Sequence, residues 1–259
     1  MFFKIIIPVF DSEYIEKCIM SIENQTFKDF VIIAINDHCT DNTFKKVKTL
    51  AQKYNNIVCI EPKEKLYIGG ARNMGIHYDI KSQYTLFIDN DDWLKAPTVF
   101  QELNNCIINN NYPDCVRLSY ECVNKEEVIT VMLDQDTPEK LVKSLYIAPW
   151  TKCIKSEIIV DFPGNTLVED IVQHIAQCDV LNTVVPFNQL AIVWNRNNPK
   201  AASLKQNQKT LLNGKRISSI FRNMADLLDL RCIHDYCEEE RQNRIQNSKE
   251  KIIETMESL

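Results

Sequence analysis

Apolar runs alternate with helix-like periodicity over the first 110 residues. Uninterrupted apolar runs of this length are typical of parallel strands that are buried on both faces. They lie at residues 4–9, 30–35, 57–60 and 85–88. Between them, apolar residues recur every three or four positions, which indicates amphipathic helices at residues 15–22, 44–51, 70–78 and 97–109. This order predicts an α/β fold with a parallel, doubly wound sheet whose ligands bind at the carboxyl ends of the strands.

The starts of three helices carry local signals. Asp11 or Ser12 can cap the first helix, and Thr40-Asp41 can cap the second. The third is expected to be entered through the flexible pair Gly69-Gly70. With Arg72 nearby, such a helix N-terminus is a reasonable phosphate site, although it is neither a Walker A loop nor a G-x-G-x-x-G loop.

The pattern changes after residue 111. Strands are expected at residues 115–120, 128–133 and 190–193, and helices at residues 138–145 and 168–178. This mixture of elements indicates a mixed sheet for the second half. From residue 211 onward the chain is expected to be helical.

Composition narrows the class of protein. Apolar residues make up 45% of the 259 and charged residues 25%, as is ordinary for a globular chain. No apolar stretch approaches the roughly 20 residues that a membrane span needs. The apolar start is interrupted by Pro8 and followed by Asp11 and Glu13, so it indicates a strand rather than a signal peptide. We therefore expect a cytoplasmic protein whose ten cysteines are thiols.

Charge is unevenly distributed. The net charge is −5, so binding to nucleic acid or to an anionic membrane would need a local basic patch. Residues 200–222 hold six basic residues and no acidic one. Such a stretch usually faces solvent, but it can also face a polyanion.

Carboxylates cluster where predicted strands and helices meet. Asp89, Asp91 and Asp92 directly follow a buried strand, and several acids there are costly without a cation or donors. Oxygen ligands of this kind suit Mg²⁺ or Mn²⁺, although a solvated turn is the simpler reading. Glu169-Asp170 opens a predicted helix. An acid at this position is either simply stabilised by the helix dipole or serves as a general base.

Taken in order, these segments resemble the family 2 glycosyltransferases of the GT-A fold. Residues 36–43 resemble that family's "DDGSTDNT", residues 71–76 its "ARNxGI" and residues 87–93 its "FLDSDDW". Further matching segments are residues 6–10, 21–30, 149–152, 169–170 and 194–203. Each motif is loose, but eight motifs in the correct order are highly specific.

The resemblance implies a GT-A architecture, with a Rossmann-like nucleotide-binding sheet, a smaller mixed acceptor-side sheet and C-terminal helices. The GT-A domain would span residues 1–204, with a nucleotide-binding half at about 1–112 and an acceptor-side half at about 113–204. Residues 205–259 would form a helical appendage. The implied activity is metal-dependent, inverting transfer of a sugar from a nucleotide-sugar to a hydroxyl of a surface glycan or lipid-linked saccharide.

The resemblance also implies a role for each matched residue. Asp170 would be the catalytic base, and Asp91 with Asp89 would bind Mn²⁺ or Mg²⁺. The donor would contact Pro8, Val9, Phe10, Asp37, Arg72, Asp89, Arg196, Lys200 and Ser203. The acceptor side would be shaped by Trp150, Lys152 and Glu169.

The sequence departs from the family pattern at several of these motifs. Asn36 replaces the first Asp of "DDGS", and His38-Cys39 replaces Gly-Ser, which leaves the base of the donor open. Tyr67 and Gly69-Gly70 also differ from the usual residues before "ARN", which leaves the donor sugar open.

Two alternatives remain at this point. The basic stretch 200–222 could hold DNA whose hydroxymethylated base is the acceptor, or it could make peripheral contact with a membrane. The chain could also be a degenerate domain that binds a nucleotide-sugar without catalysis. Asn36 favours that reading, whereas the retained Asp89, Asp91 and Asp170 oppose it.

Overall fold

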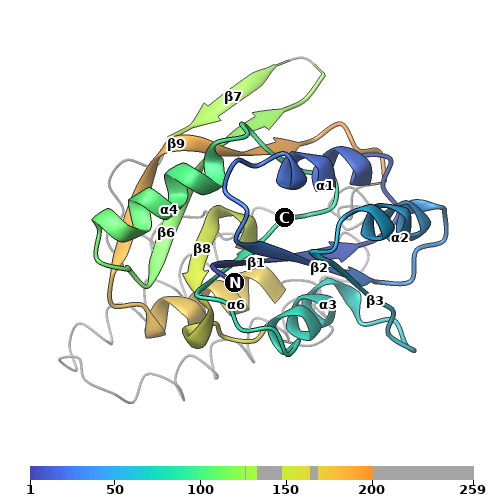
Figure 1. The fold of residues 1–259 in the computed structure, drawn as a ribbon, viewed down its shortest axis with the longest axis horizontal. Coiled ribbons are helices and arrows are strands. Elements are labelled where there is room, and N and C mark those ends of the chain that lie inside the picture. The colour runs from blue at the N-terminus through green and yellow to red at the C-terminus, as the bar shows by residue number, and fades with distance from the viewer. Residues whose placement is uncertain (126, 133–147, 164–168, 201–259) are drawn as a thin grey trace, which may run out of the picture. The chain divides into compact units, whose positions relative to one another are not determined.

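A computed structural model describes residues 1–125, 127–132, 148–163 and 169–200. Over these ranges one nine-stranded sheet runs through the molecule, in the order β3-β2-β1-β4-β8-β6-β9-β5, with β7 also paired to β6 (Figure 1). The strands are β1 (Phe3–Val9), β2 (Phe30–Asn36), β3 (Ile57–Ile60), β4 (Tyr84–Phe87), β5 (Trp93–Leu94), β6 (Cys115–Val123), β7 (Val128–Val131), β8 (Lys152–Lys155) and β9 (Val184–Asn195). The expected helix at 138–145 and the expected C-terminal helices lie outside the described residues.

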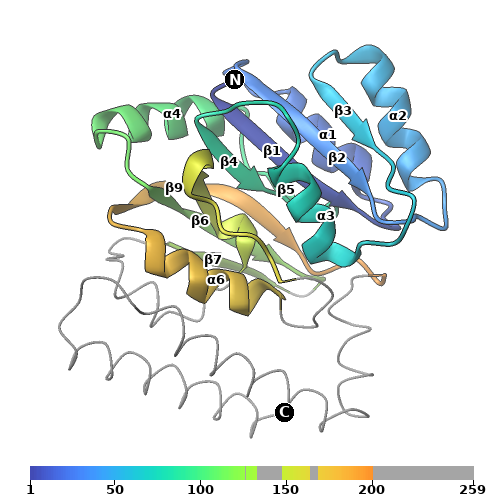
Figure 2. The same cartoon turned by 90° about the horizontal axis from the view of Figure 1, so that it is seen from below.

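Helices cover both faces of this sheet. They are α1 (Ile15–Glu23), α2 (Thr43–Lys53), α3 (Tyr67–Ile76), α4 (Val99–Asn109) and α6 (Glu169–Val180), with short 3-10 turns at Pro149–Thr151 and Ser156–Ile158. Seen from below, α3 and α6 lie in front of the strands while α1 and α2 lie behind them (Figure 2). In the described ranges no helix is long and apolar enough to cross a bilayer.

The first four strands confirm the parallel sheet predicted from the apolar runs. Strand β1 pairs in parallel with both β2 and β4, and β2 pairs in parallel with β3. Alternate residues of β1 enter different cores, because side chains of a strand point to opposite faces. Ile5 and Ile7 pack in the core that contains residues of α1, α2 and α4, whereas Ile6 packs with Ala71 of α3. Burial on both faces explains why these runs are uninterrupted.

The later strands correct one architectural expectation. A separate, smaller sheet was predicted for the second half, but β8 pairs antiparallel with both β4 and β6, so the sheet is continuous. Strand β9 runs parallel to β6 and antiparallel to β5, which makes this half mixed as expected. The last strand is longer than predicted, because exposed Asn188 and Gln189 interrupt its apolar pattern without ending it.

Helix α3 corrects a second expectation. It begins at Tyr67, so Gly69 and Gly70 lie inside the helix rather than forming a flexible entry. A Cβ at Gly69 would meet Glu169 Cγ at 3.1 Å and the Pro163 carbonyl oxygen at 3.2 Å. Gly69 therefore allows α3 to approach the start of α6 closely.

The predicted helix caps are only partly correct. Helix α1 has Tyr14 at its N-cap with no side-chain cap, and Ser12 Oγ accepts the Tyr14 N–H at 3.1 Å. Asp11 does not cap this helix, because its carboxylate accepts the Thr40 N–H at 2.7 Å instead. Helix α2 has Asn42 at its N-cap with no side-chain cap, but Asp41, one residue earlier, accepts the Thr43 N–H at Oδ1 at 2.8 Å.

Candidate active site

The carboxyl ends of three neighbouring strands form the candidate site. Because β1 lies in parallel between β2 and β4, the loops after these strands meet at one edge of the sheet. Pro8 and Val9 end β1, and Phe10 follows them. Asp37 follows β2, and Asp89 lies two residues after β4.

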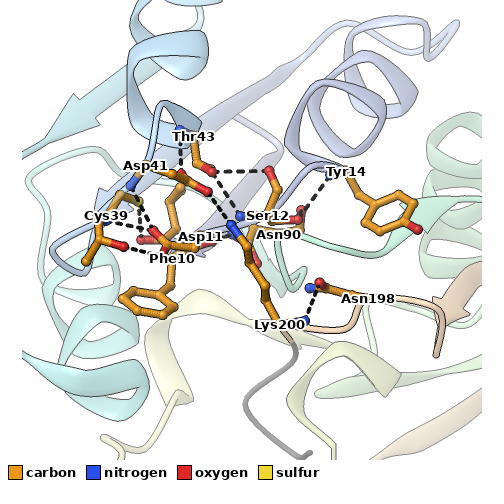
Figure 3. A network of polar contacts seen from close by, with 12 residues as sticks. Phe10, Asp11, Ser12, Tyr14, Cys39, Asp41, Thr43, Asn90, Asn198 and Lys200 are labelled. Carbon is orange, nitrogen blue, oxygen red and sulfur yellow. Dashed lines mark hydrogen bonds and ion pairs between the residues drawn. The ribbon is translucent and has the colours of Figure 1, made fainter. Parts of the chain in front are cut away.

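A network of polar contacts fastens these loops to one another (Figure 3). Asn90 donates from its side-chain amide to the Phe10 carbonyl, and Ser12 Oγ donates to the Asn90 carbonyl at 3.3 Å. Thr43 Oγ1 accepts the Ser12 N–H at 2.9 Å. Asp11 Oδ2 accepts the Thr40 hydroxyl at 2.5 Å. The site is therefore built on loops that hold one another, rather than on isolated turns.

The carboxylates after β4 lie close to one another, with Asp92 buried and Asp89 and Asp91 half-buried. Asp92 is 1% exposed, and burial together with Asp91 and Asp89 raises its pKa well above the ordinary value. Burial and the Asp89 carboxylate raise the pKa of Asp91 to about 6. Two asparagines contribute donors, one at the end of β9 and one just after it: the Asn195 N–H to Asp92 Oδ1 and Asn198 Nδ2 to Asp91 Oδ2, each at 2.8 Å.

The donor chemistry of this cluster suits a hard divalent cation. Asp89 and Asp91 supply carboxylate oxygens, and Mg²⁺ or Mn²⁺ typically takes one or two such ligands and completes its shell with phosphate and water. The raised pKa of Asp91 indicates negative charge that the nearby donors do not fully compensate. Within the described ranges, no group of three or more His, Cys, Asp or Glu side chains is arranged to hold a metal.

Arg72 of α3 connects this cluster to the start of α6. The guanidinium is 2% exposed, and its Nη2 lies 2.8 Å from Asp89 Oδ1 while its Nη1 lies 3.4 Å from Glu169 Oε1. It also lies 5.1 Å from the centre of the Phe162 ring. A buried Arg between two carboxylates fixes their separation, because breaking either pair would leave a charge uncompensated.

The first turn of α6 places two acids beside this bridge. Glu169 is buried, and Asp170 next to it is half-buried. Burial and the neighbouring Asp170 raise the pKa of Glu169 to about 7, although Arg72 opposes the shift. One turn later, buried His174 has both ring nitrogens within 3.9 Å of the Cys178 sulfur.

Two of the residues expected on the acceptor side, Trp150 and Lys152, are buried on β8 and the turn before it. Trp150 packs edge-on against Tyr120 with ring centres 4.9 Å apart. Lys152 lies opposite Arg117 of β6 in the sheet register. Burial and the Arg117 charge lower the pKa of Lys152 to about 7. Sequence reasoning missed Arg117, although an arginine inside an apolar strand was a usable signal.

The segment after β9 reaches across the site. Lys200 Nζ lies 2.9 Å from Asp41 Oδ2, a contact that links the end of the described chain to the loop after β2 (Figure 3). The Arg196 guanidinium lies 5.2 Å from the centre of the Trp194 ring. Ser203 and the remainder of the basic stretch lie outside the described residues. Asn195 and Asn198 lie within the matched segment 194–203 but were not identified as site residues, because nothing local distinguishes them from other asparagines.

Comparison with known proteins identifies the relatives of this chain. Residues 4–140 match a family model described as "Glycosyl transferase family 2". Glycosyltransferase GlyA of Streptococcus pneumoniae is 35% identical over 96 residues, which are 37% of this chain and 14% of that protein. A poly(ribitol-phosphate) beta-glucosyltransferase of Bacillus spizizenii is 35% identical over 105 residues, 39% of this chain and 16% of that protein. The chain thus matches a small part of each.

Solved structures show the same fold. TarS 1-349 of S. aureus, in complex with UDP-GlcNAc, superposes with a TM-score of 0.80 at 18% identity, over 95% of this chain and 70% of that one. A mannosyltransferase, PcManGT from Pyrobaculum calidifontis, in complex with GDP-Man and Mn²⁺, gives a TM-score of 0.61 at 12% identity, over 95% of this chain and 68% of that one.

Proposed function

The chain belongs to glycosyl transferase family 2, and from this premise we propose that it moves a sugar from a nucleotide-sugar donor to a hydroxyl group of a surface polymer. The observation that carries the proposal is the Arg72 bridge, which joins Asp89 at the end of β4 to Glu169 at the start of α6. The bridge supports a shared site for the acids after β4 and for Asp170. We likewise propose that residues up to about 112 bind the donor and that residues from about 113 to 204 face the acceptor.

The donor would lie over the ends of β1, β2 and β4. Phe10, which follows Pro8 and Val9 at the end of β1, offers an aromatic surface for the base. Asp37 and Asp89 offer acceptors for N–H and hydroxyl groups. Arg72 would act by holding Asp89 in place, because its own charge is buried between two carboxylates.

Asp91, with Asp89, would hold Mn²⁺ or Mg²⁺. A cation bound there would neutralise the charge that develops on the leaving diphosphate. Lys200 and Arg196, with Ser203, would contact the same diphosphate from the segment after β9. Lys200 is already directed across the site toward Asp41, which supports this role.

Asp170 would act as the general base. Its carboxylate would take the proton of the acceptor hydroxyl while that oxygen forms a bond to the anomeric carbon of the sugar. The bond from that carbon to the diphosphate oxygen would break on the opposite side, so the configuration inverts. Glu169, Trp150 and Lys152 would shape the acceptor side. The Asp170 carboxylate lies near enough to Lys152 to oppose the lowering of the Lys152 pKa, which supports this arrangement.

The acceptor we favour is a polymer hydroxyl of the cell surface, such as that of a polyol phosphate. The relative of Bacillus spizizenii is named for transfer to poly(ribitol-phosphate), which supports this class. A UDP-sugar is the donor to test first, because the TarS structure contains UDP-GlcNAc.

The test is transfer of sugar from UDP-sugars to polyol-phosphate polymer, with Mn²⁺ or with EDTA. We expect Mn²⁺-dependent transfer by the wild type and a loss of at least 100-fold in kcat in Asp170→Asn, because a general base typically contributes 10²–10⁴-fold. Asp179→Asn is the matched control, since Asp179 is exposed on the same helix. Transfer by Asp170→Asn at the wild-type rate would show that the base has been assigned wrongly.

A further inference from the structure

The segment just before α3 is fastened to Asp37. Asp37 Oδ1 accepts the N–H groups of Leu66 and Tyr67 at 3.1 and 2.9 Å. Tyr67 adopts a φ of 59°, a left-handed conformation that is uncommon for a residue other than glycine. The backbone here is therefore bent toward a buried carboxylate, and this bend determines where Lys65 lies.

Lys65 lies over the aromatic surface at the end of β1. Its Nζ lies 4.2 Å from the centre of the Phe10 ring and 5.8 Å from the centre of the Tyr67 ring. The same ammonium acts on Asp37: burial raises the pKa of Asp37, and the Lys65 charge opposes that shift. The Asp37 N–H donates to the Val9 carbonyl at 2.8 Å, so the carboxylate belongs to the residue beside the end of β1, while the ammonium lies over the Phe10 ring.

These two groups have complementary hydrogen-bonding characters. An ammonium only donates hydrogen bonds, and an ionised carboxylate only accepts them. Uracil and guanine each present a carbonyl oxygen next to a ring N–H, which matches one donor and one acceptor. Cytosine and adenine present an amino group next to an unprotonated ring nitrogen, which reverses that order.

We propose that Lys65 is a specificity-determining residue that favours donors with uracil or guanine over donors with cytosine or adenine. The inference rests on the proposed function, in which Phe10 and Asp37 face the base. Lys65 lies outside every motif that the family resemblance matched, and it is exposed on the surface. Its replacement should therefore change recognition without unfolding the protein.

Calorimetric titration with UDP, CDP, GDP and ADP in the presence of Mn²⁺ tests the inference. UDP and CDP differ at the 4-position of the base, a carbonyl against an amino group, and in the protonation of the adjacent ring nitrogen. We expect the wild type to bind UDP at least tenfold more tightly than CDP. In Lys65→Met we expect this ratio to fall below about three through weaker binding of UDP, whereas Lys65→Arg keeps a donor and should retain the preference.

Lys53→Met is the matched control, because Lys53 ends α2 and its Nζ lies 4.9 Å from the Tyr54 ring, away from the strand ends that form the site. It should leave all four affinities unchanged. An unchanged UDP-to-CDP ratio in Lys65→Met would overturn this inference and leave the proposed function standing. If both affinities fell by the same factor, the ammonium would act on the diphosphate instead of the base. If the wild type binds none of the four nucleotides, the proposed function fails as well.

Discussion

Replacing Asp91 by asparagine should make the metal-free protein more stable while removing its metal-dependent activity. Burial and the Asp89 carboxylate raise the pKa of Asp91 from 3.8 to about 6. A difference of about two pKa units corresponds to about 3 kcal/mol between the protonated and ionised forms. Because the side chain is not fully buried and solvent screens part of this effect, we expect a gain of about 1–3 kcal/mol at neutral pH.

The direction of the pKa shift determines how the stability difference between Asp91→Asn and the wild type depends on pH. A carboxyl whose pKa is raised by folding binds its proton more tightly in the folded state, so its stabilising contribution is complete below pH 3.8 and is lost as the pH rises through 6. Asparagine does not titrate there and keeps an oxygen that can accept the hydrogen bond from Asn198. The advantage of Asp91→Asn should therefore be largest at pH 7.5 and smaller at pH 4.5.

Urea unfolding of both proteins at these two pH values, with EDTA, measures the difference. Mn²⁺ should then raise the melting temperature of the wild type but not that of Asp91→Asn, because a ligand stabilises only the state that binds it. Asp179→Asn, at an exposed site, should show no such pH-dependent difference. The argument would be refuted if Asp91→Asn were less stable than the wild type at pH 7.5. It would also be refuted if the two free energies of unfolding differed by the same amount at both pH values.

Two further predictions concern motif residues whose roles are structural. Gly75→Ala should lose about 1–3 kcal/mol of stability, because its Cβ would come within 2.6 Å of Ile6 Cγ2. Gly70→Ala is the control: its Cβ would meet only Leu66, so stability should change by less than about 1 kcal/mol. Equal effects in urea unfolding would contradict this account. Gln25→Leu should lose about 2–4 kcal/mol in the same assay, because the Gln25 side chain bonds two backbone carbonyls and one backbone N–H, and a loss under about 0.5 kcal/mol would show that water replaces it.

The glycines of α3 show how a correct motif can carry a wrong structural interpretation. Two adjacent glycines locally indicate a flexible helix entry, and the sequence analysis placed the helix start there. The helix begins earlier, at Tyr67, and Gly69 lies inside it, where α3 closely approaches Glu169. That approach joins residues about 100 positions apart, and no local pattern reports it.

The contacts of the candidate site could likewise be predicted only in part from the sequence. Phe10, Asp37 and Asp89 could be predicted as neighbours, because each follows an apolar strand and parallel strands end at one edge. The pairing of Arg72 with both Asp89 and Glu169 could not be predicted. It depends on how closely α3 packs against α6, which is a property of two faces in contact rather than of either helix.

The sequence by itself determined the uninterrupted apolar runs and the helical period of 3.6 residues, and with them the parallel half of the sheet and the residues at its strand ends. These features are local, because a strand or a helix exposes its faces at fixed intervals along the chain. Only the tertiary structure decided that β8 joins both halves into one sheet, that the end of β9 and the segment after it supply Asn195 and Asn198 to the acids, and that Lys65 lies over Phe10. Register and packing between distant segments decide these contacts, because their energies depend on distances that exist only in the folded chain.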